Sequence, residues 1–250
     1  MKCIEYGTEH AQTLIFLHGG GLSWWNFREE AELLGQDYHV ILPILDGHAG
    51  SDLPFTGIET NAAELIAWIE RLPGRSVALI GGLSLGGQIL LEMLSQRPDI
   101  CRHAFVESAM VIPSRFTHAL IAPVLGSSYP LIQNRSFARL QFRSLHMKPN
   151  LFDDYYRDTC AIRKSDFIAF MQASTAYSLH DALQRCNSRV HLWIGSKEHL
   201  GIRRSADLLR NTIPNSTLNI LPGYVHGDFS LNHAREYVLA VRNVLEKEIP

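Results

Sequence analysis

The chain has 250 residues, of which 46% are hydrophobic and 19% charged, and its formal net charge is −2. This length suits one compact domain around one substantial core. The balanced charge argues against nucleic acid as a partner, and the N-terminal residues lack the apolar run of a secretory signal, so we expect a cytoplasmic protein. The longest weakly polar stretch, residues 120–132, is interrupted by two prolines and a glycine, so we expect no membrane-spanning helix.

Short apolar runs alternate with amphipathic stretches along most of the chain. The runs that predict strands cover residues 2–6 (a weaker edge strand), 12–17, 39–45, 76–81, 103–111, 189–194 and 217–221. Between them, apolar residues recur at helical spacing, as in residues 62–72, 89–94 and 237–245. Buried strands separated by helices predict an α/β fold with a mostly parallel, doubly wound sheet of about seven strands.

Residues 112–185 break this alternation. They contain no convincing strand, and their prolines separate short, aromatic-rich helical pieces such as residues 152–156 and 167–177. These prolines are Pro113, Pro123, Pro130 and Pro149. Because open α/β sheets bind ligands at the carboxyl edge of their strands, we expect a core of residues 1–111 and 186–250, with residues 112–185 inserted over that edge as a helical cap.

The segment Gly82-Leu83-Ser84-Leu85-Gly86 lies between a predicted strand and an apolar-periodic helix. This order of strand, sharp turn and helix is what a G-x-S-x-G nucleophile elbow requires. The glycines leave room for the turn, and Ser84 lies at a helix N-terminus, where the dipole favours developing negative charge. A glycine-rich turn with a capping serine is the simpler explanation, but the flanking elements favour Ser84 as nucleophile and the Leu85 amide as an oxyanion donor.

Four segments together resemble the α/β-hydrolase superfamily in its usual order. They are Leu17-His18-Gly19-Gly20-Gly21, residues 46–52 (DGHAGSD), the turn around Ser84, and Gly223-Tyr224-Val225-His226-Gly227. The resemblance covers most of the chain outside residues 112–185. It implies the fold and the reaction class but not the substrate.

The resemblance assigns two further roles. Gly20, two residues after His18, would supply the second oxyanion N–H, whereas an ordinary glycine turn is the alternative. His226 follows the last strand and precedes the final helix, so it would be the base that takes the proton of Ser84. A histidine that only capped the helix would leave Ser84 without a base.

The acid of the triad has two candidates. Family members usually carry Asp after the penultimate strand in a pattern like Gly-x-x-Asp, whereas this chain has Glu198 there, one methylene longer. Glu107, at the end of the strand after the nucleophile helix, occupies a position that some relatives use. We favour Glu198 and keep Glu107 as the alternative.

The other histidines and the cysteines suggest structural roles. We expect His18 and His48 to hold their loops by hydrogen bonds to the backbone, and His199 to face solvent. The four cysteines are spread singly, and the histidines show no metal-binding spacing, so we expect reduced cysteines and no metal.

Trp24 and Trp25 follow the oxyanion loop and are our candidate substrate contacts. The aromatic residues of the insertion suit an apolar acyl or alcohol group, although most of them are needed for the core of the cap itself. Our first hypothesis is a serine esterase that hydrolyses a small or medium carboxylic ester, thioester or related acyl compound through an acyl-enzyme on Ser84, without a cofactor. Its partner would be that small molecule; the sequence sets no oligomeric state.

Two other functions stay open. The same fold could act as a lyase, a carbon–carbon bond hydrolase or a synthase, and Val106-Glu107-Ser108-Ala109 is similar over a short stretch to synthases of the menaquinone pathway. A ligand receptor with little turnover is the third hypothesis. The presence of Ser84, His226 and a carboxylate argues against that third hypothesis.

Overall fold

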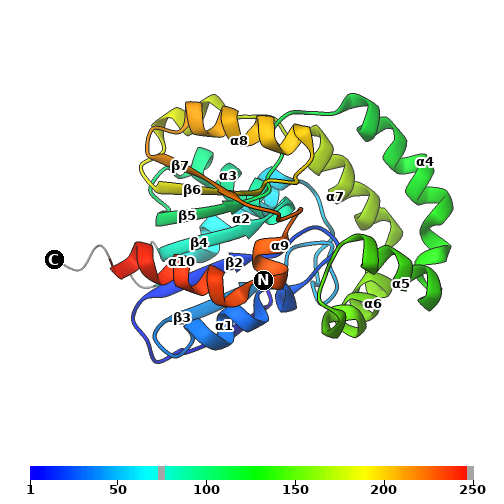
Figure 1. Ribbon diagram of the computed structural model, residues 1–250, viewed down its shortest axis with the longest axis horizontal. Coiled ribbons are helices and arrows are strands. Elements are labelled where there is room, and N and C mark those ends of the chain that lie inside the picture. The colour runs from blue at the N-terminus through cyan, green and yellow to red at the C-terminus, as the bar shows by residue number, and fades with distance from the viewer. Residues whose placement is uncertain (73–76, 247–250) are drawn as a thin grey trace.

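The computed structural model, which describes residues 1–72 and 77–246, contains a seven-stranded sheet (Figure 1). Its strands are β1 (Cys3–Tyr6), β2 (Thr13–Leu17), β3 (His39–Pro43), β4 (Val77–Leu83), β5 (Cys101–Glu107), β6 (Arg189–Gly195) and β7 (Ser216–Leu221). Their spatial order is β1-β3-β2-β4-β5-β6-β7, with β1 antiparallel to β3 at one edge and the other neighbours parallel. The mostly parallel sheet and its weak edge strand are therefore confirmed.

Two central strands have different bounds from those predicted. Ser76 lies outside the described residues, and β4 continues past Gly81 to Leu83. β5 ends at Glu107 instead of residue 111, because Ser108 has a φ of 54° and leaves the extended conformation. Each of these strands ends directly before a serine with positive φ, Ser84 in one case and Ser108 in the other.

Helices cover both faces of the sheet because its strands bury side chains on both. These helices are α1 (Arg28–Leu34), α2 (Ile58–Ile69), α3 (Leu85–Gln96), α8 (Leu200–Thr212), α9 (Asp228–Asn232) and α10 (Ala234–Glu246). Ile15 and Leu17 of β2 pack with α2 and α3, whereas Leu14 and Phe16 pack with α1 and α10. The doubly wound arrangement is confirmed, although Leu72, predicted on the apolar face of α2, lies beyond the end of that helix.

Residues 112–185 form helices only. They are α4 (Arg115–Ile132), α5 (Arg135–Ser144), η2 (Pro149–Leu151), α6 (Phe152–Ala161), α7 (Lys164–Ala176) and η3 (Asp181–Arg185). Figure 1 shows α4 to α7 beyond one end of the sheet strands, with α7 between α4 and the sheet. Within the described residues, no helix combines the length and apolarity needed to cross a bilayer.

The expectation that Pro123 and Pro130 separate helices was wrong, because both lie inside α4. A proline at position 130 cannot donate to the carbonyl of Gly126, four residues earlier. Lys164 of α7 donates its Nζ to Gly126 O at 2.7 Å and so satisfies this carbonyl. At Pro130, a neighbouring helix therefore supplies the donor that the proline lacks.

Candidate active site

Ser84 occupies the tight turn between β4 and α3. Its backbone has φ 52° and ψ −109°, a conformation that costs a residue other than glycine about 1–3 kcal/mol. A Cβ on Gly82 would lie under 3.0 Å from Gly86 O, and a Cβ on Gly86 would lie equally close to Leu17 O. The turn therefore requires both glycines of the motif.

Two backbone hydrogen bonds fix this turn. The Ser84 N–H donates to Glu107 O at 2.8 Å, which ties the turn to the end of β5, and Gln88 N donates to Ser84 O at 2.9 Å. Leu85 is the first residue of α3, where a helix leaves its N–H groups without an internal acceptor. No acceptor for the Leu85 N–H occurs among the described residues, and this amide directly follows Ser84 in the chain.

His226 and Glu198 meet from two adjacent loops. His226 Nδ1 lies 3.3 Å from Glu198 Oε2, and the Glu198 side chain is fully buried whereas that of His226 is 47% exposed. Lys197 N donates to Tyr224 O at 3.0 Å, which holds the loop after β6 against the loop after β7. A buried carboxylate therefore contacts an accessible imidazole, as predicted for a base and its acid.

The loop of His226 packs beside the turn of Ser84. A Cβ on Gly227 would lie 3.2 Å from the side chain of Leu83, the residue that precedes Ser84. No hydrogen bond joins Ser84 Oγ to His226 among the described residues. Such bonds are often long before substrate binds. The two loops nevertheless lie side by side.

Glu107, the alternative acid, is buried and bonds elsewhere. Its Oε1 accepts from Ser230 N at 3.3 Å, and its Oε2 has no hydrogen-bond partner among the described residues. Burial raises the pKa of Glu107 to about 7, partly offset by the interaction with Ser230. Of the two carboxylates, Glu198 contacts His226 and Glu107 does not.

Ser108 contacts Glu198, although no sequence pattern assigned it a catalytic part. Its hydroxyl donates to Glu198 Oε1 in a short contact, and Gly227 N approaches the same hydroxyl at 3.5 Å. Its own N–H donates to Trp193 O at 3.0 Å. The signal that could have identified it is a small polar residue directly after a buried strand that ends at the carboxyl edge of the sheet.

Two buried histidines hold the glycine loop after β2. His18 Nε2 accepts from Leu45 N at 3.1 Å, so its Nδ1 carries the proton and donates to Gly19 O at 2.9 Å. His48 Nε2 accepts from Gly21 N at 3.1 Å. Burial lowers the pKa of His48 to about 4 and the pKa of His18 well below its usual value, so both rings are neutral acceptors. The predicted backbone contacts of both histidines are confirmed.

The amide of Gly20 differs from those of its neighbours. Gly19 N donates to Asn26 Oδ1 at 3.2 Å and Gly21 N donates to His48, but no acceptor for Gly20 N occurs among the described residues. A Cβ on Gly20 would lie 3.5 Å from both the Leu85 and the Phe170 side chains. The two predicted oxyanion donors are therefore neighbours, with α7 close by.

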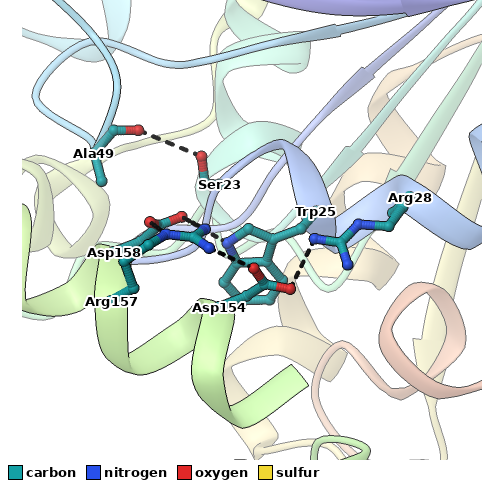
Figure 2. Close-up of polar contacts among 7 residues, drawn as sticks. All are labelled: Ser23, Trp25, Arg28, Ala49, Asp154, Arg157 and Asp158. Atoms are coloured by element: carbon teal, nitrogen blue, oxygen red, sulfur yellow. Dashed lines mark hydrogen bonds and ion pairs between the residues drawn. The ribbon is translucent and has the colours of Figure 1, made fainter. Parts of the chain in front are cut away.

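The two tryptophans after this loop have different environments. Trp25 is 1% exposed and its indole N–H donates to Asp158 of α6 at 2.8 Å, as Figure 2 shows. Trp24 is partly exposed, with the Arg28 guanidinium 4.7 Å from its ring. Arg28 also bonds to Asp154 of α6 at 2.7 Å. The burial of Trp25 favours a packing role, and Trp24 remains the candidate for substrate contact.

A cavity of about 300 Å³ opens beside His226. Apolar side chains from three segments line it, namely Leu145, Ile202 and Val225, with Lys197 and His199 also at its wall. His199 is exposed as predicted, and its Nδ1 accepts from Gly201 N at the start of α8. In residues 1–72 and 77–246, no group of three or more His, Cys, Asp or Glu side chains could hold a metal ion.

Comparisons with known proteins identify the family of the chain. Residues 14–241 match the model of the alpha/beta hydrolase family. An AB hydrolase superfamily protein of Gibberella zeae is 30% identical over 139 residues, which cover 52% of this chain and 46% of the relative. A soluble epoxide hydrolase of Corynebacterium sp. is 28% identical over 95 residues, 37% of this chain and 33% of that enzyme, so the matches span less than half of each relative.

Solved structures share the fold at low identity. An esterase from Exiguobacterium antarcticum superposes with a TM-score of 0.81 at 18% identity, covering 98% of this chain and 94% of its own. The family model, in contrast, matches most of the chain, residues 14–241. The chain belongs to the alpha/beta hydrolase family.

Proposed function

We propose that this chain is a serine hydrolase that cleaves a small or medium carboxylic ester, or a thioester or related acyl compound. The observation that carries the proposal is the strained Ser84 on its glycine turn, beside the loop that holds His226 against a buried carboxylate. A nucleophilic serine needs this strained turn, because the turn holds its hydroxyl accessible to substrate. A protein that only binds a ligand has no need for a serine in such a costly conformation. The esterase among the structural neighbours is consistent with an ester substrate.

In the first half of the reaction, Ser84 Oγ attacks the acyl carbon and its proton passes to His226 Nε2. The carbonyl oxygen becomes an oxyanion that accepts hydrogen bonds from Gly20 N and Leu85 N. Each such donor contributes about 2.7–4 kcal/mol to the transition state. The carbon–oxygen bond to the alcohol then breaks, and the alcohol leaves with the proton from His226.

In the second half, water attacks the acyl-enzyme while His226 takes its proton. The bond from the acyl carbon to Ser84 breaks, the acid leaves, and the proton returns to Ser84. Glu198 accepts from His226 Nδ1 throughout and stabilises the imidazolium. The Ser108 hydroxyl positions Glu198, and residues 112–185 act as a cap beside the site, with Trp24 as a candidate substrate contact.

Intact-mass analysis after incubation with a fluorophosphonate tests this proposal. Wild type should gain one phosphonyl group, and Ser84→Ala, with an unchanged thermal melt, should gain none. A panel of p-nitrophenyl esters of increasing chain length then measures turnover. A folded wild-type protein that resists the label would contradict the proposal, and labelling without ester turnover would favour the non-ester reactions of this fold.

A further inference from the structure

One long stretch of the chain carries only positive formal charge. No Asp or Glu occurs between Glu107 and Asp153, although the whole protein has a net charge of −2. The cations of this stretch are Arg115, Arg135, Arg139, Arg143 and Lys148. This stretch forms α4, α5 and η2, so these three elements contribute positive but no negative side chains to the surface.

Helix α4 also exposes a face with no charged side chain. This outer face consists of Phe116, Ala119, Leu120, Pro123, Val124, Ser127, Pro130 and Leu131, all of which are exposed. At about 100° per residue these positions lie on one side of the helix, opposite the buried Ile121 and Ile132. Phe116 is 77% and Val124 54% exposed, and contiguous apolar exposure of this kind marks an interaction site.

The outer face lies at the margin of the molecule. Figure 1 shows α4 at the outermost position of the helical region, with α7 on its inner side. Leu140 of α5, the next helix, is 68% exposed as well. The apolar surface therefore has free access from solvent.

Among the described residues, three of these five cations have no carboxylate partner. Arg135 pairs with Asp153, and Lys148 pairs with Glu29 at 2.7 Å. Arg115, Arg139 and Arg143 form no ion pair within the described residues. Arg115 directly precedes the outer face, and the other two lie one turn apart on α5.

We propose that the outer face of α4, together with Arg115, Arg139 and Arg143, docks on an anionic lipid bilayer. Apolar side chains of a helix lying on a membrane enter the boundary between headgroups and acyl chains, while arginines bind the lipid phosphates. The uncharged face and the acid-free stretch match both parts of such a surface. A second copy of the chain fits less well, because a symmetric dimer through this face would bring its own arginines together.

Helix α7 connects the docking surface to the candidate site. The docking proposal does not depend on the chemistry at that site. α4 packs on α7, and Phe170 of α7 lies close to Gly20 of the glycine loop. Docking would therefore hold the site near a bilayer, where apolar acyl compounds partition. The Ser84→Ala protein should bind vesicles as well as wild type does, so failure of one proposal leaves the other testable.

Co-sedimentation of the full chain with vesicles tests the docking. The vesicles are phosphatidylcholine alone, or phosphatidylcholine mixed with phosphatidylglycerol. Wild type should bind the mixed vesicles, with binding that falls as salt is added. Leu120→Glu with Val124→Glu should lower the partition coefficient at least about tenfold, and Arg139→Glu with Arg143→Glu by on the order of fivefold per arginine.

Leu239→Glu is the matched control, because Leu239 of α10 is an exposed leucine (60%) that lies outside this surface. It should leave binding unchanged, and thermal melts should show that all variants fold. Absence of wild-type binding to the mixed vesicles, or binding that survives the Leu120 and Val124 changes, would overturn the proposal. So would a dimer in light scattering that those changes convert to monomer without any vesicle binding, which would identify the face as a self-association interface.

Discussion

The turns at the carboxyl edge of the sheet and the helices of residues 112–185 are held in place by different kinds of contact. At the edge, backbone atoms approach one another so closely that a single Cβ on Gly86 would collide with Leu17 O. In the helical region, side chains from one helix complete another, as Lys164 does for Gly126 O. Short-range steric demands leave a motif in the sequence, whereas long-range side-chain contacts do not.

The largest expected effect concerns the two buried glutamates at the carboxyl edge of the sheet, Glu198 and Glu107. Glu198→Gln keeps the size of the side chain but removes the charge that holds His226, so fluorophosphonate labelling should slow by about 10²- to 10⁴-fold. Glu107→Gln should label at close to the wild-type rate, because Glu107 bonds to Ser230 and not to His226. Pseudo-first-order rates on folded proteins give the comparison, and the reverse order would make Glu107 the acid.

Replacing a glycine by alanine should change the free energy of unfolding in opposite directions in the two regions. Gly86→Ala places a Cβ against Leu17 O and should lower the free energy of unfolding by about 3 kcal/mol. Gly126→Ala meets only the end of Lys164 at 3.9 Å and should raise that free energy by about 0.5–1 kcal/mol, because alanine favours a helix. Urea denaturation of the two variants measures both effects. Equal destabilisation would mean that α4 is packed as tightly as the elbow.

The same contrast explains how far the sequence predicts the fold and the site. Alternating strand and helix patterns, and the glycines around Ser84, depend on residues close together in the chain, so they predicted the sheet and the nucleophile turn. The continuity of α4 past Pro130 was missed because the donor that this proline lacks comes from Lys164, on a different helix. The burial of Trp25 was missed because Asp158, its partner, lies 133 residues away.

The contacts of Glu198 and its neighbours show the same limit. The order of motifs favoured Glu198 over Glu107, but the contact between Glu198 and His226 exists only once two loops have met. Ser108 lies 90 residues from Glu198, and no pattern around it indicates this hydrogen bond. Sequence patterns thus predict residues that a backbone turn requires, but they do not predict contacts between side chains that are distant in the chain.

Glu107 should make stability fall with pH. Its folded-state pKa of about 7 exceeds the ordinary value of 4.5, so the folded protein holds this proton more tightly than the unfolded chain. The stabilisation is complete below pH 4.5 and is lost as pH rises through 7, by up to about 3 kcal/mol. Glu107→Gln should remove this loss, so that unfolding free energies at pH 5 and pH 8 lie closer together than in wild type. An unchanged difference would show that Glu107 is ionised in the folded protein at both pH values.

A smaller effect on the rate than that of Glu198→Gln is expected at Ser108, which combines a strained backbone with a hydroxyl bonded to Glu198. Ser108→Ala removes the hydroxyl and keeps the strain at φ 54°, whereas Ser108→Gly removes both. If the hydroxyl positions the acid, both variants should lose about tenfold in acylation rate, the cost of one charge-assisted hydrogen bond.

The pH profile separates this positioning role from a structural one. A Glu198 carboxylate without its hydroxyl donor binds the imidazolium proton of His226 more tightly, so the acid limb of the rate profile should move to higher pH in both variants. If Ser108 serves only the backbone turn, Ser108→Gly should match wild type in rate and profile while gaining stability, because glycine adopts positive φ without strain. Both variants lack the hydroxyl, but only Ser108→Gly relieves the backbone strain. Their comparison therefore decides whether the structure at position 108 depends on the backbone turn alone or also on the contact between the Ser108 hydroxyl and Glu198.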